Sequence, residues 1–341
     1  MNNSSELLQD PHVVEAFLAG DRMVIHDLGQ TYLNVMGRAP IPNEEISAFL
    51  HGSPQYLEPI GHGWGMSTDD AVRCLFDTER TKAFIQAISA SVRILKSRFP
   101  GEPLSAVEAG CGTGVLAVAM AHAGIDKVKA IDINPTTAAY TEQFINALGL
   151  SDKIEVIHAD ATVFVPDSGI HLLVSENMHT GLYFEPQQQI VAHFLPYLEP
   201  GGVLLPQGVN LRFKLASLHW DQIGAKHTEL RKAISNVWDI GETWSSWEVI
   251  EFQGQKPFDG NITGMVPFGE VANPNGLITQ MEVVIDSATV NILRNAQAQF
   301  LGQPHVVQIL VYDGSTQGKA TQGVFSYQAG GDAPDIVQLT L

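Results

Sequence analysis

The stretch Val107-Glu108-Ala109-Gly110-Cys111-Gly112-Thr113-Gly114 ends an apolar run and carries three alternating glycines. Glycines at such a place let the backbone approach a ligand closely, and the first turn of a following helix offers free amide groups to it. The next segment, Val115–Ala123, is a continuous apolar stretch of helical length. The stretch therefore predicts a ligand-binding loop between a buried strand and a helix.

The glycine pattern separates two classes of nucleotide cofactor. A dinucleotide fingerprint would place a further glycine at position 115, which is a valine, and Glu108 precedes the glycines here. Asp132 ends the next apolar run, where a carboxylate can accept both hydroxyls of a ribose, and Asp160-Ala161 follows the run after that, beside the expected adenine edge. These features favour S-adenosylmethionine over NAD. The expected cofactor residues are Glu108, Gly110, Gly112, Gly114, Asp132, Asp160 and Ala161.

Outward from the loop, apolar runs alternate with helical segments over residues 99–206. Strands that alternate with helices form a parallel sheet covered on both faces. The sequence therefore predicts an α/β fold with a Rossmann-like domain over residues 99–206. The expected strands are Leu104–Ala109, Lys127–Ile133, Lys153–His158 and Ile170–Ser175, and the expected helices are Val115–Ala123 and Thr137–Leu148.

The two flanking regions have different patterns. Residues 1–98 carry apolar side chains at helical spacing, interrupted by Gly61-His62-Gly63-Trp64-Gly65, and predict a helical N-terminal region. Residues 207–341 carry short apolar runs separated by Gly, Asn and Asp, which predict an antiparallel lobe. The expected strands of this lobe include Val209–Leu215, Leu277–Ile285, Val306–Tyr312 and Gly323–Tyr327.

Composition limits the compartment and the partners. The chain has 341 residues, 45% of them hydrophobic, which is enough for more than one lobe, and no run reaches the roughly 18 apolar residues of a membrane span. The net charge of −18 repels nucleic acid and anionic membranes and weakly favours a cationic small molecule. Only Cys74 and Cys111 are present, and the N-terminus lacks a basic and apolar leader, so we expect a soluble cytoplasmic protein.

The segment Ser175–Glu185 (SENMHTGLYFE) resembles the double-glutamate loop of protein arginine methyltransferases, in which two glutamates nine residues apart grip a guanidinium. Glu176 and Glu185 keep that spacing. Glu79-Arg80-Thr81 resembles the family's helix whose arginine holds the carboxylate of the cofactor. The resemblance implies a methyltransferase that uses S-adenosylmethionine.

Two later segments extend the resemblance into the C-terminal lobe. Leu198–Pro206 resembles the family's lead-in to a β-barrel, and Pro304–Tyr312 is similar to the barrel's Thr-His-Trp loop and the strand that follows it. The implied architecture is a β-barrel-like substrate lobe over residues 207–341.

The same loops also depart from the family. Asn177 and His179 stand where the family has Trp and Gly, and Val306 stands where it has a Trp beside the loop histidine, which weakens the expectation of a protein substrate. The resemblance brings Glu176, His179 and His305 to one pocket, and two histidines with one carboxylate can hold a divalent metal. Alternatively, these side chains contact substrate without a metal, or His179 merely packs.

These observations leave three hypotheses. The leading one is C-methylation of the β-carbon of a small 2-oxo acid, with 5-guanidino-2-oxopentanoate as candidate, in specialised-metabolite biosynthesis such as that of antibiotics. A similar group is the bacterial 2-oxo acid C-methyltransferases, and here Glu176, Glu185, His179 and His305 would be catalytic, with a metal stabilising an enolate. The alternatives are N-methylation of arginine or another guanidino compound, and a non-catalytic protein that keeps the fold. A homodimer stays open.

Overall fold

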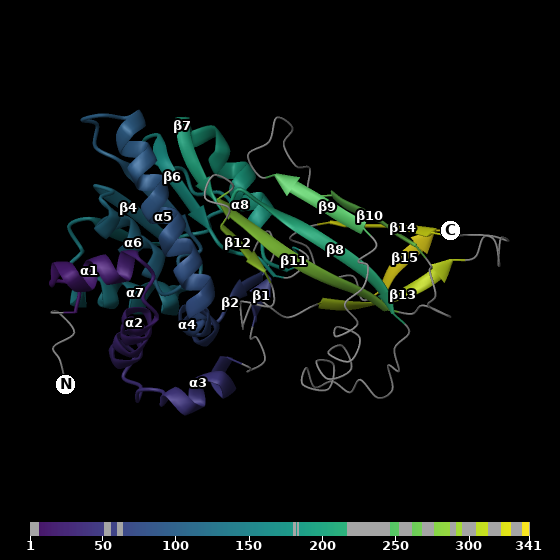
Figure 1. Ribbon diagram of the computed structural model, residues 1–341, viewed down its shortest axis with the longest axis horizontal. Coiled ribbons are helices and arrows are strands. Elements are labelled where there is room, and N and C mark those ends of the chain that lie inside the picture. Colours follow the sequence, from purple (N-terminus) through teal and green to yellow (C-terminus); the bar gives the residue numbers. More distant parts are fainter. Residues whose placement is uncertain are drawn as a thin grey trace.

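A computed structural model of the chain describes residues 7–50, 56–59, 64–179, 182 and 184–216, and beyond these the strands 246–251, 261–267, 276–286, 291–294, 305–312, 322–328 and 336–340. The described part contains two large sheets and a set of helices around the first of them (Figure 1). The first described helix, α1 (Pro11–Leu18), lies at the end of the molecule away from the second sheet.

The first sheet is parallel and has the strand order β5-β4-β3-β6-β7. Its strands are β3 (Ser105–Ala109), β4 (Lys127–Asp132), β5 (Ile154–His158), β6 (Ile170–Ser175) and β7 (Leu198–Leu205). The chain runs outward from β3 through β4 to β5 and then returns to the other side of β3 with β6. Ligands of open α/β sheets bind at the carboxyl ends of the strands where the order reverses in this way. The predicted Rossmann-like fold is confirmed.

Four helices connect or cover these strands: α5 (Thr78–Arg98), α6 (Val115–Ala123), α7 (Pro135–Ala147) and α8 (Gln187–Phe194). Helix α6 is apolar on all sides, and its residues from Val115 to Ala121 are all buried, because α5 packs over it. Helix α7 packs against β5, so the loop residues between β4 and α7 are fixed beside the carboxyl ends of the sheet.

The N-terminal region is helical, as expected, and contains α1 (Pro11–Leu18), α2 (Arg22–Val35), α3 (Asn43–Leu50) and α4 (Thr68–Phe76). Asp10 and Asp21 cap α1 and α2 by accepting backbone amide hydrogens. The interruption predicted at residues 61–65 includes the start of β2 (Trp64–Met66). This strand pairs antiparallel with β1 (Tyr56–Pro59), and the sequence indicated neither strand because both are too short to show alternation.

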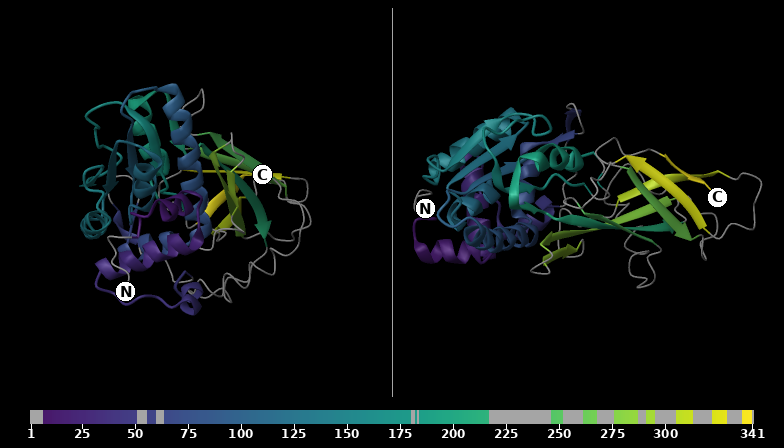
Figure 2. Two further views of the ribbon diagram at one scale, coloured as in Figure 1. Left: turned by 60° about the vertical axis from the view of Figure 1, so that its left-hand side comes forward. Right: turned by 90° about the horizontal axis from the view of Figure 1, so that it is seen from above.

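The second sheet has the path β10-β14-β15-β13-β11-β8-β9, with β12 paired to β11, and its described pairs are antiparallel except β13 with β15. Strands β8 and β11 run away from the first sheet (Figures 1 and 2). The four expected strands fall within β8, β11, β13 and β14, whereas β9, β10, β12 and β15 were not expected. A closed barrel remains a prediction. The bounds are β8 Gly208–Ala216, β9 Ser246–Glu251, β10 Asn261–Pro267, β11 Gly276–Asp286, β12 Asn291–Arg294, β13 His305–Tyr312, β14 Gln322–Gln328 and β15 Ile336–Thr340.

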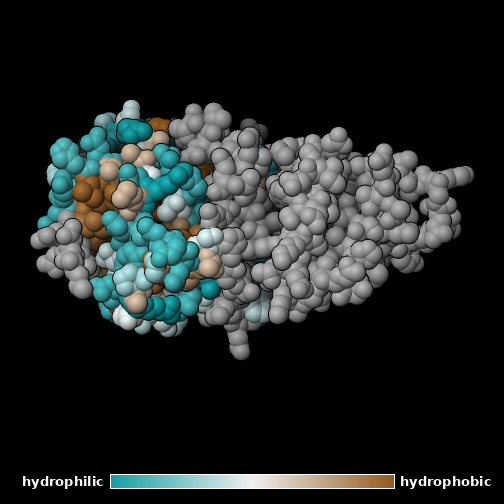
Figure 3. Space-filling model, turned by 60° about the horizontal axis from the view of Figure 1, so that its bottom comes forward, coloured by the Kyte–Doolittle hydropathy of each residue, from teal (hydrophilic) through white to brown (hydrophobic). Residues whose placement is uncertain are grey.

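The second sheet is joined to the first domain by a shared core. Side chains of β8 and β11, among them Phe213 and Val283, belong to the same buried apolar cluster as Ile85 and Ile88 of α5. One face of the described N-terminal part carries mostly hydrophilic side chains with smaller apolar areas between them (Figure 3). Among the helices in the described ranges, none is long and apolar enough to span a membrane.

Gly29 on α2 provides a test of this packing. A Cβ at this position would lie 2.8 Å from Leu75 Cδ2 and from Phe76 Cζ, both buried. We expect Gly29→Ala to lower the free energy of unfolding by about 1–2 kcal/mol, because overpacking outweighs the higher helix propensity of alanine. Asn34→Ala, at an exposed position of the same helix, is the control and should leave stability unchanged or slightly raised. Urea unfolding measures both, and equal midpoints would contradict the packing.

Candidate cofactor and substrate site

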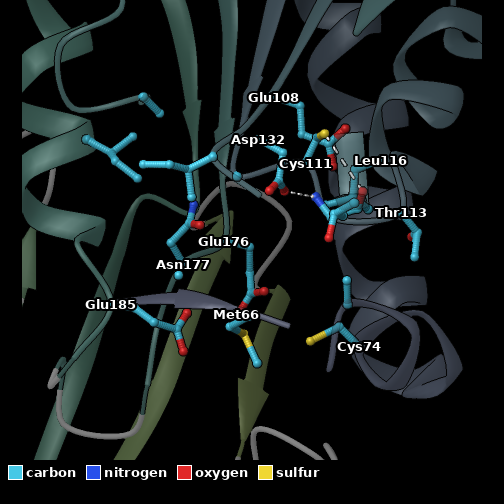
Figure 4. A pocket seen from close by; sticks show the side chains of 18 of the residues that line it. Met66, Cys74, Glu108, Cys111, Thr113, Leu116, Asp132, Glu176, Asn177 and Glu185 are labelled. Atoms are coloured by element: carbon cyan, nitrogen blue, oxygen red, sulfur yellow. Dashed lines mark hydrogen bonds between the residues drawn. The ribbon is translucent and has the colours of Figure 1, made fainter. Parts of the chain in front are cut away.

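A pocket lies at the carboxyl ends of β3, β4 and β6, where the strand order reverses (Figure 4). It contains about 1060 Å³ of space, part of it continuous with solvent. All the expected cofactor residues except Gly114 line it, together with Glu176 and Glu185. Its further lining residues include Trp64, Met66, Cys74, Cys111, Thr113, Thr162, Asn177 and Ile190.

The cofactor loop has a backbone that favours glycine. Gly110, Gly112 and Gly114 have φ of 71°, 51° and 72°, in the left-handed region. The Gly112 amide donates to Asp132 Oδ2 at 2.8 Å, and the Asn134 amide donates to Asp132 Oδ1 at 2.8 Å. The Asp132 carboxylate therefore shapes the loop as well as lining the pocket.

Glu108 has a role that sequence reasoning did not resolve. Its Oε2 accepts the amide hydrogen of Ala117 at 2.7 Å, in the first turn of α6, where the N-cap residue Gly114 offers no side chain. Glu108 therefore acts as a cap from a neighbouring strand. Burial raises its pKa to about 8, although the Ala117 amide works in the opposite direction.

The cofactor loop is also held by Thr141 of α7, which in turn contacts Tyr32 of the N-terminal region. The Thr141 hydroxyl donates to the Gly112 carbonyl at 2.6 Å, and the Tyr32 hydroxyl lies 3.1 Å from the same Thr141 oxygen. Tyr32 is fully buried on α2, 109 residues away in sequence from its partner. The spacing of the apolar residues places Tyr32 in the core but gives no sign of this contact.

Asp160 and Ala161 lie on the pocket wall, as expected, with Thr162 beside them. One carboxylate oxygen of Asp160 accepts both the amide and the hydroxyl hydrogens of Thr162, at 2.8 and 2.7 Å. Asp160 therefore fixes its own turn, and the backbone of this turn is available to the edge of an adenine.

Arg80 and Glu176, which both line the pocket, form an ion pair. Arg80 Nη1 also donates to the Cys74 carbonyl at 3.2 Å. Arg80 Nε and Glu176 Oε1 are buried and have no hydrogen-bond partner within the described part of the chain. Buried polar atoms of this kind are expected to meet a ligand, since leaving them unpaired costs free energy.

Glu185 lies near the same guanidinium group. Its side chain is buried, and burial raises its pKa to about 8; Arg80 lowers this pKa and Asp70 raises it. Figure 4 shows Glu176 and Glu185 both directed into the pocket, with Asp132 and Glu108 across from them. Both glutamates therefore line the same pocket, and their catalytic role stays a prediction.

The segment between these glutamates carries backbone strain. Leu182 and Phe184 have φ of 59° and 60°, backbone angles that residues other than glycine rarely adopt. The Leu182 amide donates to the His179 carbonyl at 2.7 Å, and the Trp64 amide of β2 donates to the Phe184 carbonyl at 2.8 Å. The unexpected strand pair β1–β2 thus holds the segment between Glu176 and Glu185 at Phe184.

The proposed metal set is only partly described. His179 is half-buried, with its ring edge-on to Phe184 at 5.1 Å between centroids. The side chain of His305, at the start of β13, lies outside the described residues. Among the residues that are described, no three His, Cys, Asp or Glu side chains are grouped to hold a metal ion. The metal therefore remains a prediction.

Comparison with known proteins gives the domain its class. Residues 106–202 match the family model described as a methyltransferase domain. The chain is 34% identical over 150 residues to an arginine N(omega)-methyltransferase of Streptomyces achromogenes subsp. streptozoticus, covering 42% of this chain and 39% of that protein. It is 29% identical over 136 residues to a probable protein arginine N-methyltransferase 6 of Arabidopsis thaliana, covering 40% and 30%. The chain thus spans less than half the length of these relatives.

Two solved structures match the chain with TM-scores just below 0.5. A PRMT1 enzyme–prozyme complex of Trypanosoma brucei with AdoHcy has a TM-score of 0.48 at 16% identity, over 74% of this chain and 85% of that one. A PRMT6–SAH structure has a TM-score of 0.49 at 12% identity, over 74% and 92%.

The pocket fits the cofactor of a methyltransferase domain, S-adenosylmethionine. Glycines shape a loop that a nucleoside can approach, and Asp132 lies at the end of β4 with its carboxylate at the pocket. Arg80 offers a buried Nε–H in the same pocket, suited to a carboxylate. The described domain is therefore that of an S-adenosylmethionine-dependent methyltransferase.

The titration of Asp132 predicts how cofactor affinity depends on pH. Burial raises the pKa of Asp132 to about 6, against the lowering effect of the Asn134 and Gly112 amides. Only the ionised carboxylate accepts two ribose hydroxyls, so the affinity for S-adenosylhomocysteine should fall about fivefold between pH 6 and pH 5. The amino group of that ligand titrates near pH 8 and its carboxyl group below pH 4, outside this window.

Calorimetry from pH 5 to pH 7 measures this dependence, with Asp132→Asn as the control. The variant should bind weakly and with little dependence on pH. A wild-type affinity that is constant over the window would contradict the assignment of Asp132 to the ribose.

Proposed function

We propose that the protein transfers the methyl group of S-adenosylmethionine to a guanidino nitrogen of a small molecule, with free arginine as the first candidate. The observation that carries this proposal is that two buried glutamates, Glu176 and Glu185, line one pocket together with the guanidinium of Arg80, which pairs with Glu176. Carboxylates in such a place bind a guanidinium through charge-assisted hydrogen bonds.

Arg80 shows which ligand chemistry the two glutamates accept. Its guanidinium pairs directly with Glu176 and lowers the pKa of Glu185. A planar guanidinium presents five donors, more than one carboxylate can use. A substrate guanidinium placed between Glu176 and Glu185 would therefore satisfy Glu176 Oε1, which has no partner among the described residues.

In the proposed reaction, bound S-adenosylmethionine supplies an electrophilic methyl group on a sulfonium. Arg80 would hold the carboxylate of the cofactor, and Asp132 its ribose. Glu176 and Glu185 would fix the plane of the guanidinium so that one nitrogen faces the methyl group. A guanidinium must lose a proton when its nitrogen is alkylated, and the ionised carboxylate of Glu185 or Glu176 can accept that proton at an Oε atom.

Three observations support a small substrate. The net charge of −18 favours a cation over a nucleic acid or an anionic surface. One relative is named as an arginine methyltransferase, without a protein substrate in its name. Asn177 and His179 replace the Trp and Gly expected in the loop of the enzymes that modify proteins.

A homodimer stays a prediction, which light scattering tests.

C-methylation of 5-guanidino-2-oxopentanoate remains the second candidate. His179 favours it, because an imidazole three residues after Glu176 adds a group that can move a proton near neutral pH. The same two glutamates would bind the guanidino end of that substrate. The two reactions differ in the atom that is methylated and in the need for enolisation.

Mass spectrometry with methyl-labelled S-adenosylmethionine distinguishes these functions. We expect arginine to gain one label on a guanidino nitrogen, and Glu176→Gln and Glu185→Gln to lower the rate about 100-fold or more, because the carboxylates orient the attacking nitrogen. Glu79→Gln is the matched control, since Glu79 pairs with Arg22 outside the pocket, and it should retain the wild-type rate.

The alternative outcomes are also specific. Label on the β-carbon of the 2-oxo acid, with β-proton exchange in heavy water in the absence of cofactor, would replace the proposal with the second candidate. Intact binding of S-adenosylhomocysteine without methylation of either compound would contradict both.

The raised pKa of Glu185 predicts that the protein releases a proton when arginine binds. With a pKa of about 8 it is mostly protonated at pH 7, and an adjacent guanidinium favours its ionised form, so arginine binding should release up to one proton. Calorimetry in buffers of different ionisation enthalpy measures this release. Citrulline, which is neutral and of similar shape, should release none, and Glu185→Gln should abolish the release with arginine. Release that persists in Glu185→Gln would show that another group titrates.

A further inference from the structure

Gln187, the first residue of α8, ties together the two ends of the double-glutamate loop. Its side chain is completely buried. Its Oε1 accepts from the Ser175 hydroxyl and from the Asn177 amide, each at 3.0 Å, and its Nε2 donates to the Ser175 carbonyl at 2.9 Å. Ser175 is the last residue of β6, so one carboxamide joins this strand to the helix that follows the loop.

Asn177 extends this set of hydrogen bonds to the cofactor loop. Its Nδ2 donates to the Ala109 carbonyl at 2.7 Å and to the Ser175 hydroxyl at 3.0 Å. Ala109 immediately precedes Gly110, and a Cβ on Gly110 would overlap the Asn177 carboxamide. The carboxamide of Asn177 thus lies directly between the loop that binds the cofactor and the loop that carries the glutamates.

The positions of the glutamates depend on these contacts. Glu176 lies between Ser175 and Asn177, both held by Gln187, and Glu185 is two residues before Gln187. The loop between them is strained at Leu182 and Phe184, so its geometry must be imposed by its surroundings.

We propose that Gln187 and Asn177 are positioning residues that set the carboxylate of Glu176 relative to the cofactor loop, and that the reaction depends on them although Gln187 does not line the pocket. This inference rests on the proposed function, because the position of Glu176 matters to the rate only if Glu176 binds the substrate. A displacement of about 1 Å in such a group can cost a factor of about 100 in rate.

Gln187→Met removes the three hydrogen bonds while keeping the size of the side chain and the helix propensity. We expect kcat with arginine to fall by about 100-fold, while the affinity for S-adenosylhomocysteine changes little, because the glycine loop and Asp132 are untouched. Gln189→Met, on the same helix and only half-buried, is the matched control and should keep the wild-type kcat. Equal losses of cofactor affinity and kcat in Gln187→Met, or an unchanged kcat, would overturn the proposal.

Gln187→Glu provides a rescue within one variant. A protonated carboxyl group has one accepting oxygen and one O–H donor, and so reproduces the bonds of the carboxamide, whereas an ionised one cannot donate to the Ser175 carbonyl. Burial raises the pKa of a carboxyl group, so the group introduced by this substitution becomes protonated as the pH falls. The ratio of the variant's rate to the wild-type rate should therefore rise as the pH falls from 8 to 6. A flat ratio would overturn the proposal, and using the ratio cancels the titration of Asp132 and Glu185.

Hydrogen exchange separates a failure of this inference from a failure of the proposed function. The Asn177 amide should be protected in the wild-type protein and exchange faster in Gln187→Met, whatever the substrate is. Protection lost in the variant, together with no methylation of arginine or its 2-oxo acid by the wild type, would refute the proposed function and the dependence of rate on these residues. Protection unchanged in Gln187→Met would refute the inference even if arginine is methylated.

Discussion

The burial of four carboxyl groups around one pocket is the constraint on which the site depends. A buried carboxylate is costly unless hydrogen bonds or a cation compensate for the lost water. Asp132 is compensated by backbone amides of Gly112 and Asn134, and Glu176 by the guanidinium of Arg80. Glu108 and Glu185 each have a pKa raised to about 8, so their neutral forms relieve the cost.

These different solutions fit the two ligands of different charge that the proposed function requires. On the cofactor side, the backbone has already fixed the acidic groups, so a nucleoside meets acceptors that are held in place. On the proposed substrate side, Glu176 is paired with Arg80, and Glu185 is mostly protonated at neutral pH because its pKa is raised. A cation is the ligand that converts both into strong interactions, because it offers the charge that neither water nor backbone supplies there.

The sequence predicted the parts of this arrangement that follow from local pattern. Helix α6 and strand β6 begin and end at the expected residues, because a continuous apolar run between glycines or polar residues has few alternatives. Asp132 was predicted to line the pocket because it stands at the end of a predicted strand. The contacts of Tyr32 with Thr141, and of Gln187 with Ser175, could not be found in this way, since they join residues whose relative placement exists only in the folded chain. The strands β1 and β2 were too short to carry a pattern.

The polar set around Gln187 also explains how the loop places its glutamates. An apolar side chain at position 177 would hold the loop by packing, which is tolerant of direction, whereas Asn177 holds it by hydrogen bonds to Ala109 and Ser175, which fix direction as well as distance. Such a set stabilises one arrangement only when each member is satisfied, and a half-satisfied set is worse than an apolar contact. The Asn177 carboxamide uses both of its donor hydrogens and Gln187 Oε1 accepts twice. The loop that contains the strained residues Leu182 and Phe184 is therefore held by hydrogen bonds at both of its ends.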